Sequence, residues 1–118
     1  MANSDDVVHQ ALLALHKAVL AAERANLERV HGSLSSAAFL QIVSDPLRYG
    51  WLKPLSQLIL AFEEDEEERL PAEELLAQAR ELLGPPKQQT PFGRRYLSLM
   101  QREPALVLAQ GKLAQLLR

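Results

Sequence analysis

The sequence predicts an all-α protein, a single-domain bundle of five or six helices over residues 1–118 with a kinked central helix at Gly50 and Pro54. Leucine and alanine dominate while glycines and β-branched residues are few, a composition that favours helices. Apolar residues recur at spacings of three and four, and no segment shows the alternation of a strand. A chain of this length can bury one core but not two.

The clearest helical pattern lies near the N-terminus. Residues 1–4 are expected to be flexible and residues 5–31 to form one helix, with Ser4 as its cap and Gly32 as its stop. The apolar positions of this helix are Val8, Leu12, Leu15, Val19 and Ala22, widened by Leu13, Leu20 and Leu27. Because this face is wide, we expect it to contact at least two other helices. A short second helix is predicted at 36–44.

The central stretch, residues 46–65, is predicted to be one helix with a bend. Asp45 suits the N-cap and Pro46 the first helical position. Pro54 removes the hydrogen bond to the carbonyl of Gly50, and Gly50 has no side chain to resist bending. We therefore favour one kinked helix. Two separate helices remain an open alternative, because the residue before a proline avoids the α region.

An apolar stripe is predicted to run through this bend. Its members are Leu47, Trp51, Leu55, Leu58 and Phe62. Trp51, the only tryptophan, is therefore placed in the core together with the first helix. Full burial of its side chain contributes about 4–6 kcal/mol, so replacing it with alanine is expected to be severely destabilising.

Three proline-marked segments complete the predicted bundle. A helix is expected after Pro71, with Gly84 as its stop, and residues 85–89 read as a short linker. Another helix begins at Thr90 and Pro91. Pro104 interrupts it, so the last segment is either a sixth helix or a kinked continuation.

Charge is unevenly distributed along the chain. Residues 1–60 are neutral overall, residues 61–84 carry −7 and residues 85–118 carry +5, for a net charge of −2. We expect the acidic and basic segments to pair, either within one chain or across a symmetric dimer. The sequence leaves this choice open.

Several function classes are disfavoured by the composition. The chain has no cysteine, which excludes disulfides, thiolate catalysis and cysteine-based zinc sites. No phosphate-binding glycine loop, nucleophile elbow or H-E-x-x-H motif occurs, so an enzyme is the less favoured class and no catalytic residue or cofactor is predicted. The N-terminus resembles no signal peptide and no apolar run approaches a membrane span, so we expect a cytoplasmic protein without membrane contact.

Nucleic-acid binding is also disfavoured. The basic residues of the C-terminal third are Lys87, Arg94, Arg95, Arg102, Lys112 and Arg118. They lie near two aromatic residues, but the pI of about 5.9 argues against a nucleic-acid partner.

One weak metal-binding motif is present. Glu28 and His31 form an E-x-x-H pair, the motif that di-iron bundles use twice together with two further glutamates. Only one copy occurs here. We expect His9, His16 and Glu23 to be half-exposed at the edge of the apolar face. The acidic run 63–68 lacks the spacing of a calcium loop and is expected to be a solvated surface.

Two segments, "ERVHG" (28–32) and "DPLRYGWLKPLSQLI" (45–59), resemble the pattern of a family of small bacterial proteins of unassigned function. The matching positions are Asp45, Pro46, Trp51, Leu52, Pro54, Leu55, Ser56, Leu58 and Ile59, and "FGRRYL" (92–97) also fits. The resemblance implies a bacterial helical protein. It implies no activity.

Two functional hypotheses follow. The first is a non-catalytic interaction module that self-associates or binds a partner helix through an apolar groove near the kink. The alternative is a protein that binds a small ligand or metal near Glu28 and His31 or at the bend. The candidate binding residues are Arg48, Tyr49, Trp51, Lys53 and Ser56.

Overall fold

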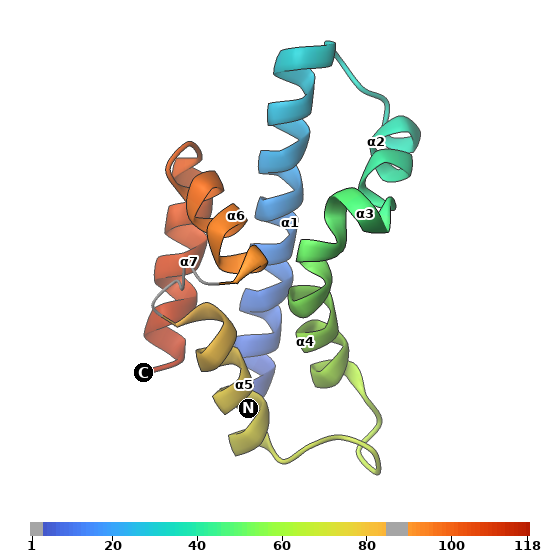
Figure 1. Cartoon of the computed structure of the whole chain (residues 1–118). Helices are drawn as coiled ribbons and strands as arrows, with labels where there is room; N and C mark the ends of the chain where they lie inside the picture. Colours follow the sequence, from blue (N-terminus) through green and yellow to red (C-terminus); the bar gives the residue numbers. More distant parts are fainter. Residues whose placement is uncertain (1–3, 85–89) are drawn as a thin grey trace.

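The longest helix, α1 (Ser4–His31), is the element against which the others pack in the computed structural model, which describes residues 4–84 and 90–118 (Figure 1). The predicted apolar face of α1 is buried, and Leu12, Leu15 and Val19 are fully inaccessible to solvent. Gly32 ends the helix with φ of 78°, a left-handed conformation that glycine adopts without strain. The α1 prediction is confirmed, with a start one residue earlier.

The remaining helices are short, and the described residues contain no strand. Their bounds are α2 (Ser36–Val43), α3 (Pro46–Tyr49), α4 (Lys53–Glu63), α5 (Ala72–Leu83), α6 (Pro91–Met100) and α7 (Pro104–Leu116). The all-α class is therefore confirmed, and Pro104 begins a separate last helix. None of the described helices combines the length and apolarity needed to cross a membrane. Residues 1–3 and the predicted linker at 85–89 lie outside the described residues.

The predicted bend lies between α3 and α4. A single 3-10 turn, Gly50–Leu52, replaces regular α-helix there. Asp45 caps α3, since its Oδ1 accepts a hydrogen bond from the backbone N–H of Leu47 at 3.0 Å. The kink is thus confirmed, but it separates two α-helices, and α4 ends at Glu63 rather than at residue 65.

The 3-10 turn changes which side chains face the core. Such a turn has three residues per turn rather than 3.6, so the apolar stripe of α4 does not continue along α3. Leu55 is fully buried, whereas Leu47, predicted on the same stripe, is 97% exposed. Tyr49 is buried in its place. The placement of Leu47 in the core was wrong.

Trp51 also differs from its predicted place in the core. It is only partly buried and packs against the edge of the core, with its ring 6.2 Å from that of Phe92. The tryptophan therefore stands between the core and the surface, where it is available to a site.

Because Trp51 is only partly buried, we expect Trp51→Ala to lower the free energy of unfolding by about 1–3 kcal/mol, less than the roughly 3–5 kcal/mol typical of a fully buried aromatic residue. Urea denaturation followed by far-ultraviolet circular dichroism measures this directly, since the variant lacks the only tryptophan. A loss above about 4 kcal/mol would contradict the partial burial.

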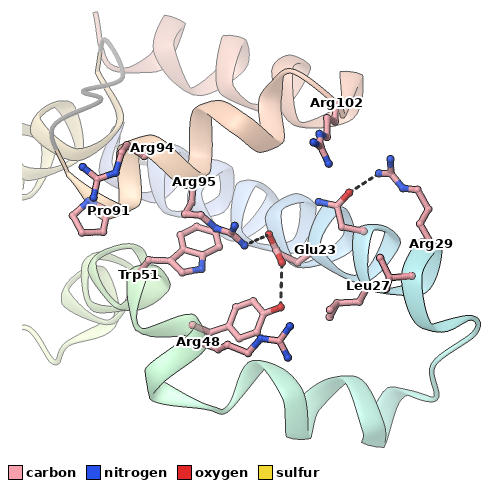
Figure 2. Close-up of a pocket in the computed structure, with 12 residues that line it drawn as sticks. Glu23, Leu27, Arg29, Arg48, Trp51, Pro91, Arg94, Arg95 and Arg102 are labelled. Carbon is pink, nitrogen blue, oxygen red and sulfur yellow. Dashed lines mark hydrogen bonds and ion pairs between the residues drawn. The ribbon is translucent and has the colours of Figure 1, made fainter.

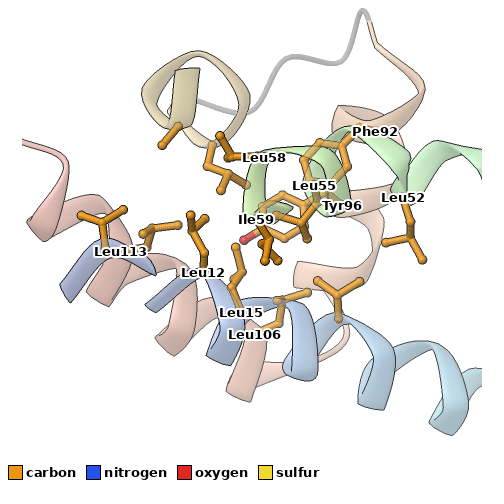
Figure 3. Close-up of a cluster of buried hydrophobic side chains, with 14 of the residues drawn as sticks. Leu12, Leu15, Leu52, Leu55, Leu58, Ile59, Phe92, Tyr96, Leu106 and Leu113 are labelled. Carbon is orange, nitrogen blue, oxygen red and sulfur yellow. The ribbon is translucent and has the colours of Figure 1, made fainter. Parts of the chain in front are cut away.

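The core is built where α4, α6 and α7 converge on α1 (Figure 3). Tyr96 of α6 is almost fully buried, and its hydroxyl donates a hydrogen bond to Oε1 of Gln110 on α7. The Gln110 Nε2 donates in turn to the backbone carbonyl of Leu83 at 2.8 Å. This chain of hydrogen bonds joins α5, α6 and α7 around the core, so α6 is held against the two helices beside it.

Candidate functional site: an arginine-lined cleft

A cleft of about 700 Å³ lies beside the bend, between the C-terminal half of α1, the α3 segment and α6 (Figure 2). Five arginines line it: Arg29, Arg48, Arg94, Arg95 and Arg102. The other lining residues are Glu23, Asn26, Leu27, Val30, Tyr49, Trp51 and Pro91. We call this site the arginine cleft. Its lining carries five positive side chains and one carboxylate.

Local structure explains why these arginines share one site. Arg95 and Arg102 are seven residues apart, close to two helical turns, so they project to the same side of α6 and of the turn that follows it. Arg48 reaches the cleft because α3 is set at an angle to α4 by the bend. Arg29 comes from the last turn of α1. Three segments distant in the sequence therefore contribute to one positive surface.

The single carboxylate of the cleft is buried. Glu23 is 3% exposed. Its Oε2 accepts a hydrogen bond from the Tyr49 hydroxyl at 3.2 Å, and its Oε1 lies 3.4 Å from the Nη2 of Arg95. The prediction of a half-exposed Glu23 was wrong, because its position lies within the buried face of α1. The predicted partial exposure of His9 and His16 is confirmed.

Burial and the neighbouring carboxylate affect the ionisation of Tyr49. Burial, followed by the charge of Glu23, raises the pKa of the Tyr49 phenol above its usual range. The phenol therefore stays neutral at ordinary pH and serves as the hydrogen-bond donor to Glu23. The Glu23 carboxylate contacts Tyr49 of α3 and Arg95 of α6, so it connects both of these helices to α1.

Trp51 forms one wall of the cleft and is covered by Arg95. The guanidinium carbon of Arg95 lies 5.4 Å from the centre of the indole ring, within the range of a cation–π interaction. Figure 2 shows this guanidinium between the ring and Glu23. The buried indole Nε1 has no hydrogen-bond partner among the described residues. A ligand that moves Arg95 would therefore change the surroundings of the only tryptophan.

The arginines differ in how far their charge is already compensated. Arg29 contacts Oδ1 of Asn26 at 2.5 Å and Oε1 of Glu103 at 3.3 Å. Arg48 and Arg102 make no hydrogen bond or ion pair with any other residue that the structure describes. Their charges are therefore available to an incoming anion.

Of the binding residues predicted from the sequence, some line the cleft and others lie outside it. Arg48, Tyr49 and Trp51 all line the arginine cleft. Lys53 and Ser56 do not line it: Lys53 is exposed and Ser56 is half-buried on α4. The groove beside the bend was expected to be apolar, and its lining is instead rich in arginine.

The sequence did not lead us to expect Glu23 and Arg29 in the site, nor the arginines of α6 beside the bend. A signal for Glu23 was present, since it follows Val19 by four residues and precedes Leu27 by four, on the face that is buried. The seven-residue spacing of Arg95 and Arg102 was likewise readable. No local pattern, however, predicted that α6 and α3 line the same cleft.

The predicted metal pair gains no further ligand. The Oε2 of Glu28 accepts a hydrogen bond from the backbone N–H of Leu34 at 2.8 Å, so this carboxylate holds the loop after α1. His31 is exposed at the end of α1. Across residues 4–84 and 90–118, no group of three histidine or acidic side chains is arranged to hold a metal ion. A metal site at Glu28 and His31 stays a prediction.

Comparison with protein-family models, with curated proteins and with solved structures finds no match to this chain. The resemblance to small bacterial helical proteins therefore stays a prediction.

Proposed function

We propose that the protein is a non-catalytic interaction module that binds an acidic segment of a protein partner in the arginine cleft. The observation that carries this proposal is the gathering of five arginines around one carboxylate, which is itself buried and partnered. Guanidinium groups bind carboxylates through paired, charge-assisted hydrogen bonds. An anionic partner compensates the charge that the cleft carries.

The extent of the positive surface favours an extended ligand over a single small anion. Arg94 lies in the first turn of α6 and Arg102 just beyond its end, eight residues later. At 1.5 Å per helical residue this corresponds to about 12 Å. An extended peptide rises about 3.3 Å per residue, so roughly four residues of a partner would cover this distance. One phosphate or carboxylate group would contact only part of it.

A peptide partner also suits the charge of the whole protein. The net charge is −2, and six consecutive acidic residues lie elsewhere in the chain, at 63–68. A nucleic acid would be repelled by these residues, whereas a short acidic peptide can bind locally in the cleft. The absence of a recognisable catalytic motif is why the proposal is of binding alone.

Trp51 provides a direct test of this proposal. We expect a hexaglutamate peptide to change the Trp51 fluorescence in a saturable way, because binding draws Arg95 toward the ligand and away from the ring. The effect should weaken steeply between low salt and about 0.5 M salt, since exposed charge pairs are screened. A hexalysine peptide serves as the control ligand and should give no saturable change.

Charge-reversed variants test whether the cleft is the site. We expect Arg48→Glu with Arg102→Glu to weaken hexaglutamate binding at least about tenfold, which corresponds to 1.4 kcal/mol. Neither arginine has a partner among the described residues, so the fold should be retained. Lys112→Glu on α7 is the matched control, because Lys112 is exposed and does not line the cleft. Equal weakening by the control, or a response to pyrophosphate or an oligonucleotide but not to hexaglutamate, would contradict the proposal.

A further inference from the structure

We propose that the acidic segment bound in the arginine cleft is residues 63–68 of a second copy of this chain. This inference rests on the proposed function and names its partner. Copies would associate head to tail, with the loop of one in the cleft of the next. The interacting groups on the two sides are of opposite charge and are both exposed on the same molecule.

The acidic loop is presented for contact. All six of its residues, Glu63 to Glu68, are exposed. Backbone hydrogen bonds from Glu68 and Arg69 to the carbonyl of Asp65, at 3.0 and 2.8 Å, fold the segment into a turn. Of the six carboxylates, the one on Glu63 lies 2.9 Å from His9. The remaining five make no ion pair with another described residue, so the turn holds a dense negative charge at the surface.

Within one chain the loop and the cleft do not meet. Figure 1 shows the loop between α4 and α5 at one end of the molecule, whereas α3 and α6 flank α1 well away from that end. The arginines Arg29 and Arg95 pair with Glu103 and Glu23 rather than with the loop. The attraction between the acidic and basic segments of this chain can therefore be satisfied between copies.

The loop differs from the cleft in shape as well as in charge. Because the segment after α4 is folded into a turn, it would enter the cleft as a compact group of carboxylates rather than as an extended strand. One loop bound in one cleft leaves the other loop and the other cleft of the pair unoccupied. Association can therefore continue head to tail to larger species as concentration rises, unless a two-fold arrangement places each copy's loop in the other's cleft.

Sedimentation velocity of the full chain tests the inference. We expect the weight-average mass to rise with protein concentration at about 20 mM salt and to return to the monomer value at about 0.5 M salt, because the contact is electrostatic. A protein that stays monomeric at every concentration and salt would overturn the inference. If such a protein still changed its Trp51 fluorescence on addition of hexaglutamate, the proposed function would stand. If it did not, the proposed function and the self-association would both be contradicted.

Two charge-reversed variants identify the surfaces. The cleft variant carries Arg48→Glu and Arg102→Glu, and the loop variant carries Glu66→Lys and Glu67→Lys. We expect each variant alone to associate more weakly than the unmodified chain, because the cleft variant lowers the net charge of the cleft from +4 to 0 and the loop variant lowers that of the loop from −6 to −2. The equimolar mixture should recover association, since the unmodified loop of the cleft variant meets the unmodified cleft of the loop variant. Lys112→Glu should associate like the unmodified chain. Undiminished association of either variant alone, or no recovery in the mixture, would overturn the inference.

Discussion

Replacing Leu55 with alanine is expected to lower the free energy of unfolding by about 2–5 kcal/mol. Leu55 is fully inaccessible to solvent and is the third residue of α4, directly after Pro54. It belongs to the cluster in which α4 and α6 pack on α1 (Figure 3). The substitution removes buried apolar surface and leaves a cavity that the surrounding helices fill only in part. Since a domain of this size is stable by only about 5–15 kcal/mol, the loss is a large fraction of the total.

Leu47 provides a matched control for this prediction. It is the same residue type, eight positions earlier, on the stripe that helical periodicity predicts to be continuous with Leu55. Because Leu47 is 97% exposed, we expect Leu47→Ala to change stability by no more than about 0.5 kcal/mol. Urea denaturation followed by circular dichroism measures both variants. Equal losses would mean that the stripe does run through the bend and that the 3-10 turn is wrongly placed.

The second large effect concerns the buried pair Glu23 and Tyr49. We expect Glu23→Ala to lower the free energy of unfolding by about 1–3 kcal/mol, because the Tyr49 hydroxyl loses its charged acceptor and a buried volume is vacated. The contribution of Arg95 is small, since its side chain is 54% exposed and water can replace the carboxylate. Glu66→Ala, at an exposed position, serves as the control and should have no measurable effect.

A double-mutant cycle separates the hydrogen bond from other effects of these substitutions. We expect Tyr49→Phe and Glu23→Ala together to destabilise the protein by less than the sum of the two single variants, with a coupling of about 0.5–3 kcal/mol. Strict additivity would show that the two side chains do not interact.

Glu23→Gln should also tighten hexaglutamate binding although it destabilises the fold, because the carboxylate that competes for Arg95 is removed.

The raised pKa of Tyr49 adds a dependence on pH. The phenol has a higher pKa in the folded than in the unfolded protein, so its contribution to stability is complete below the unfolded value of 10.0 and is lost as pH rises above it. Burial raises the pKa of Tyr96 in the same direction. Stability should therefore decline in the alkaline range, and Tyr49→Phe should reduce the steepness of that decline. An unchanged slope would contradict the assignment to Tyr49.

Elements with a strong local pattern could be predicted from the sequence. The spacing of Val8, Leu12, Leu15 and Val19, with Gly32 after the last turn, defines α1 almost to the residue. Asp45 before Pro46 and Thr90 before Pro91 mark the starts of α3 and α6, and in both the side chain accepts the capping hydrogen bond. These features depend on residues within one or two helical turns, so a single sequence is sufficient to find them.

The arginine cleft could be predicted only in part. Arg48, Tyr49 and Trp51 were identified because aromatic and charged residues beside a bend are unusual. Their partners Arg29 and Arg95 lie 19 positions before Arg48 and 47 positions after it. No helical period relates positions so far apart, and in the sequence the α6 arginines form part of a basic C-terminal third with no visible link to the bend.

Helical periodicity thus determined the fold class and the elements, since each depends on neighbours close in the chain. The tertiary structure decided the rest. One 3-10 turn changed the phase of the stripe, which exposed Leu47, buried Tyr49 and brought Trp51 to the edge of the core. Packing of α6 on α1 then placed Arg95 beside Glu23. These outcomes depend on contacts between distant segments, which hydrophobic burial selects only when the whole chain packs together.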